Sequence, residues 1–166
     1  NLFLHLGKSN VYFNKTSYGS LVISGNQPSF NHFLFKINFE NFSYEFLSGQ
    51  LASKKINDIK RVKRFIGGRK FLFNINDKVV FGFGDVILYT GINRSLEFAY
   101  INPLSPYFLE SFGNEEETTI DGDNDNSMLF ILMEYSIFNN ATLFSEILID
   151  DFQVDNTPQD NALGIK

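Results

Sequence analysis

A basic run between residues 54 and 64 carries the densest positive charge in this sequence, KKINDIKRVKR. Lysine and arginine heads donate charge-assisted hydrogen bonds, so such a run can hold an acidic sugar or a lipid-linked phosphate. It can equally be a solvated charge run or pair with another loop. Ile56, Ile59 and Val62 recur every third residue, which favours a short amphipathic helix. The residues predicted to bind glycan are Lys54, Lys60, Arg61, Lys63 and Arg64, and Lys55 is the remaining basic residue of the run.

An acidic run, EEETTIDGDNDN, covers residues 115–126. Asp121, Asp123 and Asp125 have the spacing of the first ligands of a calcium loop. Asn126 stands where that loop needs glycine and Leu132 where it needs a bidentate glutamate, so an EF-hand is excluded. An irregular cation site at the three aspartates is the weaker hypothesis. The alternative is an acidic loop that pairs with the basic run.

The remaining charges lie among apolar residues and predict a polar network in the lumen of a barrel, or structural packing of a plug. Glycoside hydrolysis needs two cooperating carboxylates. Asp150 and Asp151 are adjacent on an expected strand, so their side chains point to opposite faces and cannot act together as such a pair. The residues of the predicted network are Arg69, Arg94, Glu134, Glu146, Asp150 and Asp151.

No enzyme signature accompanies these charges. His5 and His32 are far apart in sequence and lack a companion ligand motif, so structural roles are expected rather than zinc binding. The chain has no cysteine, no Ser-His-Asp order, no P-loop and no dinucleotide fingerprint. We therefore expect neither catalysis nor a cofactor.

The elements that position these charges are β-strands, which the sequence indicates as segments where apolar and polar residues alternate with a period of two. Alternating apolar residues cover 31–39, 42–51, 70–89 and 127–152, with turns expected at Glu40-Asn41, Asn76-Asp77 and Asn139-Asn140. The strands run about 9–12 residues, close to the tilted spanning length of a membrane β-strand. The tight turns would lie at one end of the sheet. The long excursions 52–68 and 91–126, the latter including residues 96–101, would lie at the other, as in outer-membrane barrels.

The last hairpin fixes its own register. Leu129, Ile131, Met133, Tyr135 and Ile137 form one uninterrupted apolar face. If the apolar faces of the two strands coincide, Glu134, Glu146 and Asp150 share the other side. A slip of one residue would place Glu146 among aliphatic side chains, which is costly.

Composition agrees with a membrane barrel. Among 166 residues there are 20 Phe and 7 Tyr, and aromatic residues favour strands and the outer wall of such barrels. No apolar run approaches the roughly 20 residues of a transmembrane helix. A net charge of −5 argues against nucleic acid as a partner. The sequence opens on NLFLHLG, which is typical of mid-strand, so we expect a fragment forming one domain over residues 1–166.

A linear order of motifs resembles the Wzi-type capsule-assembly family of the outer membrane. It consists of GSLVISGNQPSF (19–30), KRFIGGRKFLF (63–73), FGFGDVILYTG (81–91), FAYINPLSPYF (98–108), DNS (125–127) and SEILIDDFQ (145–153). Three places depart from the family pattern: Arg69 stands where histidine is common, Asp85 where glutamate is expected, and Leu129 and Phe130 occupy a stretch where a glycine is usual.

The resemblance implies an all-β fold, an antiparallel up-and-down meander forming part of an outer-membrane β-barrel, with room for a short helix in the long loops. It also implies a bacterial outer-membrane location, with membrane lipid and capsular or extracellular polysaccharide as partners. The polysaccharide would be bound without catalysis. The alternatives are an outer-membrane channel for another cargo and a soluble β-rich carbohydrate-binding or adhesion domain.

Overall fold

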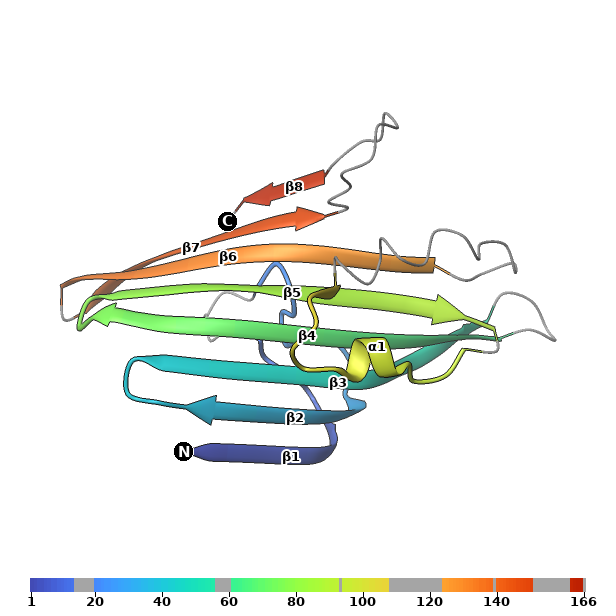
Figure 1. Cartoon of the computed structure of the whole chain (residues 1–166). Coiled ribbons are helices and arrows are strands. Elements are labelled where there is room, and N and C mark those ends of the chain that lie inside the picture. The colour runs from blue at the N-terminus through green and yellow to red at the C-terminus, as the bar shows by residue number, and fades with distance from the viewer. Residues whose placement is uncertain are drawn as a thin grey trace.

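The computed structural model is one antiparallel sheet whose strands follow each other in chain order (Figure 1). It describes residues 1–13, 20–55, 61–92, 94–107, 124–138, 140–150 and 162–165. The elements are β1 (Leu2–Ser9), β2 (Phe30–Asn38), β3 (Phe42–Lys55), β4 (Arg61–Asn76), β5 (Val79–Gly91), α1 (Phe98–Ile101), β6 (Asn124–Phe138), β7 (Ala141–Asp150) and β8 (Ala162–Ile165). The predicted all-β, up-and-down meander is confirmed. The sheet is not closed, because β1 and β8 form its two edges.

The connections sort by length only in part. The three tight turns lie at one end of the sheet as predicted, but the long excursion expected over residues 52–68 is wrong, because β3 extends to Lys55 and β4 begins at Arg61 and only residues 56–60 lie between them. The strand boundaries leave only residues 39–41, 77–78 and 139–140 between paired strands at one end, which is the left end in Figure 1. The connections from β1 to β2 and from β5 to β6 are much longer, and the latter holds α1. The middle turn lies one residue later than predicted. The Asn76 carboxamide oxygen accepts hydrogen bonds from the Lys78 and Val79 backbone N–H groups, both at 2.9 Å, and so keeps Asn76 at the strand end.

The amphipathic helix expected over residues 54–64 is wrong for the described part of that segment. Lys54 pairs with Val62 and Lys55 with Arg61 as strand residues, after a bulge between Leu51 and Lys54. Residues 56–60 lie outside the described residues. A single helical turn is unfavourable on its own, whereas each paired strand residue adds ladder hydrogen bonds and β-branched Val62 packs well in a sheet. Among the described residues, no helix is both long and apolar enough to cross a bilayer.

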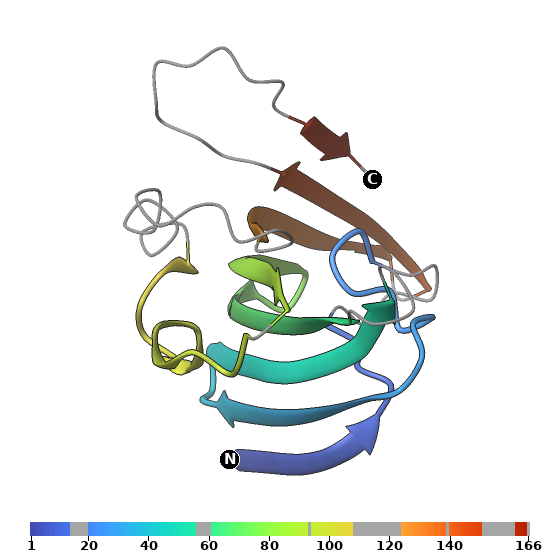
Figure 2. The same ribbon diagram turned by 90° about the vertical axis from the view of Figure 1, so that its right-hand side faces the viewer.

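Alternation gives the sheet two different faces. Met133 lies opposite Ser145 and Leu132 opposite Glu146, so the expected register is confirmed: Glu134, Glu146 and Asp150 share one face. We call that side the packed face, because residues 10–13 and 20–30 lie against it. The other side is the aromatic face, and segment 94–107 with α1 covers part of it. Figure 2 shows these two segments on opposite sides of the sheet.

The main core lies on the packed face. Phe13 is fully buried there, and its ring meets that of Phe130 edge-on at 5.9 Å. A Cβ at Gly68 would lie 3.0 Å from the Phe13 ring, so the glycine makes room for this segment. Gly82 and Gly84 of β5 also lie on the packed face, opposite Leu132 and Phe130 of β6. Their missing side chains are replaced by Leu132 and Phe130 of the neighbouring strand. The buried cluster comprises Val11, Phe13, Ile23, Phe30, Leu47, Ile66, Val86, Phe130 and Leu132.

Candidate functional site

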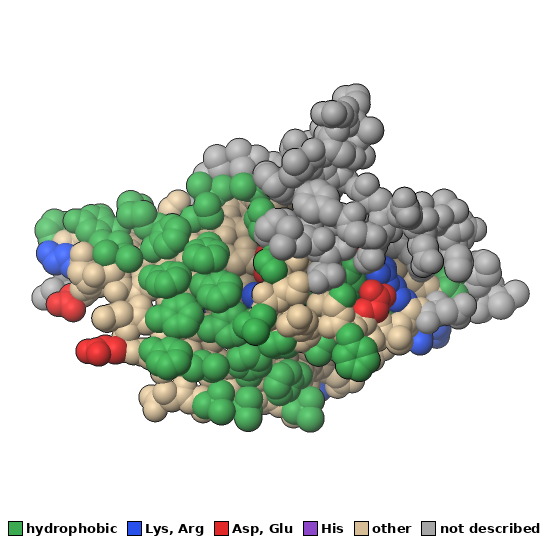
Figure 3. Space-filling model, in the orientation of Figure 1, with side chains coloured by type: hydrophobic (Ala, Val, Ile, Leu, Met, Phe, Trp, Pro, Cys, Tyr) green, Lys and Arg blue, Asp and Glu red, His purple; other side chains and the backbone are tan. Residues whose placement is uncertain are grey.

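The aromatic face carries a broad exposed apolar surface. The predicted aliphatic row of β6 lies on it, and Met133 at its centre is 44% exposed. No second sheet or helix covers that row among the described residues. Figure 3 shows hydrophobic side chains across this face, with most charged groups at its two ends. Exposed members of the surface include Leu2, Leu4, Leu6, Phe33, Phe81, Phe83, Ile131, Met133, Tyr135, Ile137 and Leu143.

Aromatic rings tie the strands together beneath this surface. A ladder of contacts runs from Phe35 through Tyr44 and Phe71 to Phe83, with successive ring centroids 5.5, 4.8 and 5.2 Å apart. These rings come from β2, β3, β4 and β5 and stabilise the register through cross-strand pairs. Along β6 the row from Leu129 to Ile137 spans about 26 Å at roughly 3.3 Å per residue. With the tilt of about 35–45° that barrel strands have, this row would cover about 20 Å of the apolar band of about 25 Å found in outer-membrane barrels.

An ion pair is buried in the same face. Arg69 of β4 and Asp85 of β5 lie opposite each other in register and bond twice, Nε to Oδ1 at 2.9 Å and Nη2 to Oδ2 at 2.6 Å. Arg69 is 2% exposed and Asp85 7% exposed.

Tyr107 closes the segment 94–107 over this ion pair. Its backbone N–H donates to Asp85 Oδ2 at 2.9 Å, and its ring lies 3.7 Å from the Arg69 guanidinium carbon. A Cβ at Gly67 would lie 2.6 Å from the Tyr107 hydroxyl, so only glycine permits this approach. Burial raises the pKa of the Tyr107 hydroxyl well above its ordinary value, so the ring stays neutral. The segment is thus fixed by a buried charge and a neutral ring.

A second polar cluster holds the start of the same segment. Arg94 pairs with Glu97 and with Asp125 at the beginning of β6, with Nη2 to Oδ2 at 2.7 Å for the latter. The Tyr100 hydroxyl donates to Asp125 Oδ2 at 2.6 Å. Asp125, a residue of the hypothetical cation site, is therefore engaged by a guanidinium and a phenol. Asp121 and Asp123 lie outside the described residues.

The predicted lumen network is wrong as a single cluster. Arg69 and Arg94 serve the aromatic face and its segment, whereas Glu134, Glu146 and Asp150 lie on the packed face. Sequence alternation assigns faces within one hairpin but does not relate distant hairpins, which is why the two arginines were misplaced. Asp151 lies outside the described residues.

Charges on the packed face are paired with one another or hold the described residues 20–30 against the sheet. Glu146 is fully buried and accepts hydrogen bonds from the Ser20 hydroxyl and the Leu21 backbone N–H, both at 2.8 Å. Glu45 pairs with Lys70 at 3.1 Å and with Lys36 at 3.8 Å. Inward-facing charges that are paired and covered by a loop are typical of a plugged barrel lumen.

The basic run lies at the end of the sheet opposite the tight turns. Lys54, Lys55, Arg61 and Lys63 are exposed there and Arg64 is half-buried, while Lys60 is outside the described residues. Lys55 and Arg61 are paired across the ladder and share the aromatic face, whereas Lys54 pairs with buried Val62 and shares the packed face. The basic side chains therefore project from both faces of the β3–β4 hairpin and do not form one flat patch.

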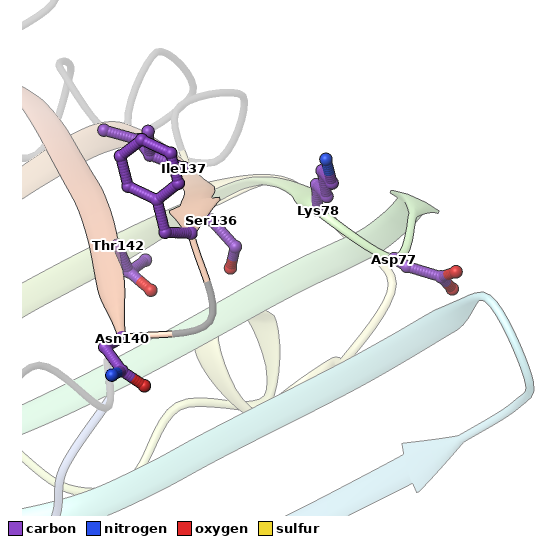
Figure 4. Close-up of a pocket in the computed structure, with 7 residues that line it drawn as sticks. Asp77, Lys78, Ser136, Ile137, Asn140 and Thr142 are labelled. Carbon is purple, nitrogen blue, oxygen red and sulfur yellow. The ribbon is translucent and has the colours of Figure 1, made fainter.

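An open hollow lies between the β4–β5 and β6–β7 turns (Figure 4). Asp77 and Lys78 are the only ionisable groups in its lining. One carboxylate and one amine at the ends of exposed turns do not form a nucleophile with its base. The hollow lining comprises Asp77, Lys78, Ser136, Ile137, Phe138, Asn140 and Thr142.

No family model matches the chain, and no curated protein or solved structure matches it either. The class of the protein is thus defined by its own geometry. It is an antiparallel up-and-down sheet with long strands, short turns at one end, an exposed aromatic face and a charged face covered by its own chain.

Proposed function

We propose that this chain forms part of the wall of an outer-membrane β-barrel, with its aromatic face toward lipid and its packed face toward the lumen. The observation that carries the proposal is the exposed row around Met133, which lies on the same face as Phe81 and Phe83. Soluble proteins rarely expose so continuous an apolar surface. A soluble adhesion domain would need to bury this row against a second sheet.

The packed face supports the same orientation. Glu45 is paired with Lys70, and Glu146 accepts hydrogen bonds from Ser20 and Leu21, as expected where lipid is excluded. In this arrangement the segment 10–30 is a plug. The long connections and the basic run then lie together on one rim.

For the biological role we propose surface attachment or organisation of extracellular polysaccharide, by binding and without bond-breaking chemistry. The order of motifs that resembles the Wzi-type family supports this role, and the exposed basic rim suits an acidic glycan. A gene-deletion strain tests it: we expect loss of capsule retention at the cell surface. Normal retention, together with ion conductance of the purified protein in planar bilayers, would favour a channel for another cargo.

The membrane assignment is tested by placing a charge on the aromatic face. Met133→Arg puts a guanidinium at the middle of the proposed lipid-facing band, whereas Phe138→Arg changes a side chain that is 74% exposed beside the tight turn. We expect Met133→Arg to reduce the free energy of unfolding in phospholipid vesicles by about 2–4 kcal/mol, and Phe138→Arg by about 0–1 kcal/mol, because the cost depends on depth. Equal, small effects of the two changes would contradict lipid contact.

A further inference from the structure

The two histidines of the chain, remote in sequence, meet on neighbouring strands. His5 lies on β1 and His32 on β2, and they are diagonal neighbours in the ladder, because His5 pairs with Leu34 and Gly7 pairs with His32. His5 Nδ1 is 3.0 Å from His32 Nε2. The ring centroids are 4.8 Å apart with the planes tilted by 37°. Gly7 lies opposite His32 and adds no side chain above the pair.

The tautomer of His32 is fixed by its second nitrogen. His32 Nδ1 is 2.9 Å from the Phe30 carbonyl oxygen, which can only accept, so Nδ1 carries the proton. Nε2 of His32 therefore presents a lone pair, and His5 Nδ1 donates to it. An imidazole whose far nitrogen donates to a backbone carbonyl is oriented as metal-binding histidines usually are.

We propose that His5 Nδ1 and His32 Nε2 bind a divalent transition-metal ion, with Cu²⁺ preferred over Ni²⁺ and Zn²⁺. Metal–imidazole bonds are about 2.0–2.1 Å long. Two nitrogens at that distance from one ion and 3.0 Å apart subtend about 94° at the metal. That angle is close to the right angle of tetragonal coordination, which suits Cu²⁺ and Ni²⁺ better than tetrahedral Zn²⁺.

Binding requires the two rings to turn, because an ion that subtends about 94° with the two nitrogens lies about 43° off the line along which their hydrogen bond now points. The proton of His5 moves from Nδ1 to Nε2 by exchange with water, both rings stay neutral, and the hydrogen bond between them is replaced by two coordinate bonds. His5 is half-buried on the edge strand, so the ion can enter from that side. The described residues contain no group of three or more His, Cys, Asp or Glu able to hold a metal, so water completes the coordination.

Copper titration of the full chain tests the site. The protein is purified without a polyhistidine tag, inserted in phospholipid vesicles and titrated with Cu²⁺ by calorimetry and electron paramagnetic resonance. We expect one ion per chain, with hyperfine coupling to two imidazole nitrogens. Because the chain contains only two histidines and no cysteine, the signal is diagnostic.

His5→Gln is the decisive variant, since His5 is only half-buried whereas His32 is 4% exposed and helps hold the strand. We expect His5→Gln to weaken Cu²⁺ affinity at least about tenfold, because losing a ligand costs no less than losing an outer-shell partner. Leu6→Gln, on the other face of β1, is the matched control and retains wild-type affinity. Wild-type affinity of His5→Gln, or a spectrum without imidazole coupling, would overturn the proposal.

Discussion

The buried pair of Arg69 and Asp85 offers the sharpest test of how segment 94–107 is held. The Asp85 carboxylate accepts three hydrogen bonds, two from Arg69 and one from the Tyr107 backbone N–H. Removing one partner of a buried ion pair costs about 3–5 kcal/mol, because the other charge stays buried without compensation. Asp85→Asn leaves a guanidinium that cannot lose its proton, so we expect a loss in that range.

Arg69→Met should cost less, at about 3 kcal/mol or below, because the stranded carboxyl group can take up a proton. The double variant Arg69→Met with Asp85→Leu removes both charges and keeps the volume, so we expect it to be more stable than Asp85→Asn alone. The longer pair of Lys36 and Glu45, in which Lys36 is half-buried and Glu45 is buried, is the control. Lys36→Met should cost no more than about 1 kcal/mol, since that pair is longer and partly solvated.

The assay is urea unfolding of the full protein in phospholipid vesicles. Free energies of unfolding are compared between variants whose unfolding free energy depends on urea concentration with the same slope. Limited proteolysis within residues 94–107 gives a local readout, and Asp85→Asn should expose that segment to cleavage. Additive effects of the two single changes within about 0.5 kcal/mol would refute the reasoning, because independent sites behave that way.

Three further outcomes follow from the same geometry. Ser20→Ala removes a hydrogen bond to buried Glu146 and should cost about 1.5–3 kcal/mol while increasing hydrogen exchange in residues 20–29; unchanged exchange would contradict the role of this contact. Gly84→Ala should lower stability by about 1–3 kcal/mol, because the new Cβ would lie 2.0 Å from the Arg69 carbonyl oxygen. Gly7→Ala is the control, since its Cβ would meet nothing nearer than 3.4 Å. Similar melting temperatures of the two variants would argue against the close approach at Gly84. Glutamine substitutions in the basic run should weaken binding to polygalacturonate but not to neutral dextran and flatten its salt dependence, and unchanged binding across a salt series would rule the run out. The residues to be replaced are Lys54, Arg61, Lys63 and Arg64.

Strand assignment was the part of the fold most accessible from sequence. Period-2 alternation located β2, β3, β5, β6 and β7 to within a few residues, because one face of each strand is apolar. The β6–β7 register followed from the cost of burying Glu146. The end of β3 and the first half of β4 were missed, because these residues are rich in charge and alternate weakly, while the partner strands still supply their hydrogen bonds.

The polar clusters were much less accessible. Arg69 and Asp85 are 16 residues apart, and only the register of β4 against β5 makes them neighbours. Tyr107 and Tyr100 gave no signal, since a residue in a long connection has no periodicity from which its packing partner can be inferred. The contact between His5 and His32 likewise depends on a long connection, residues 10–29, returning the chain beside β1.

The position of Arg69 and Asp85 also constrains the membrane proposal. An ion pair on a lipid-facing surface would be costly if bare, and here the two charges neutralise each other beneath Tyr107. Their row lies at the middle of β4 and β5, one rung from the row of Phe71, Phe83 and Ile131 on the side of the long connections. Segment 94–107 therefore covers the two charges where the proposed lipid-facing band ends, and it shields them from the surroundings of the sheet.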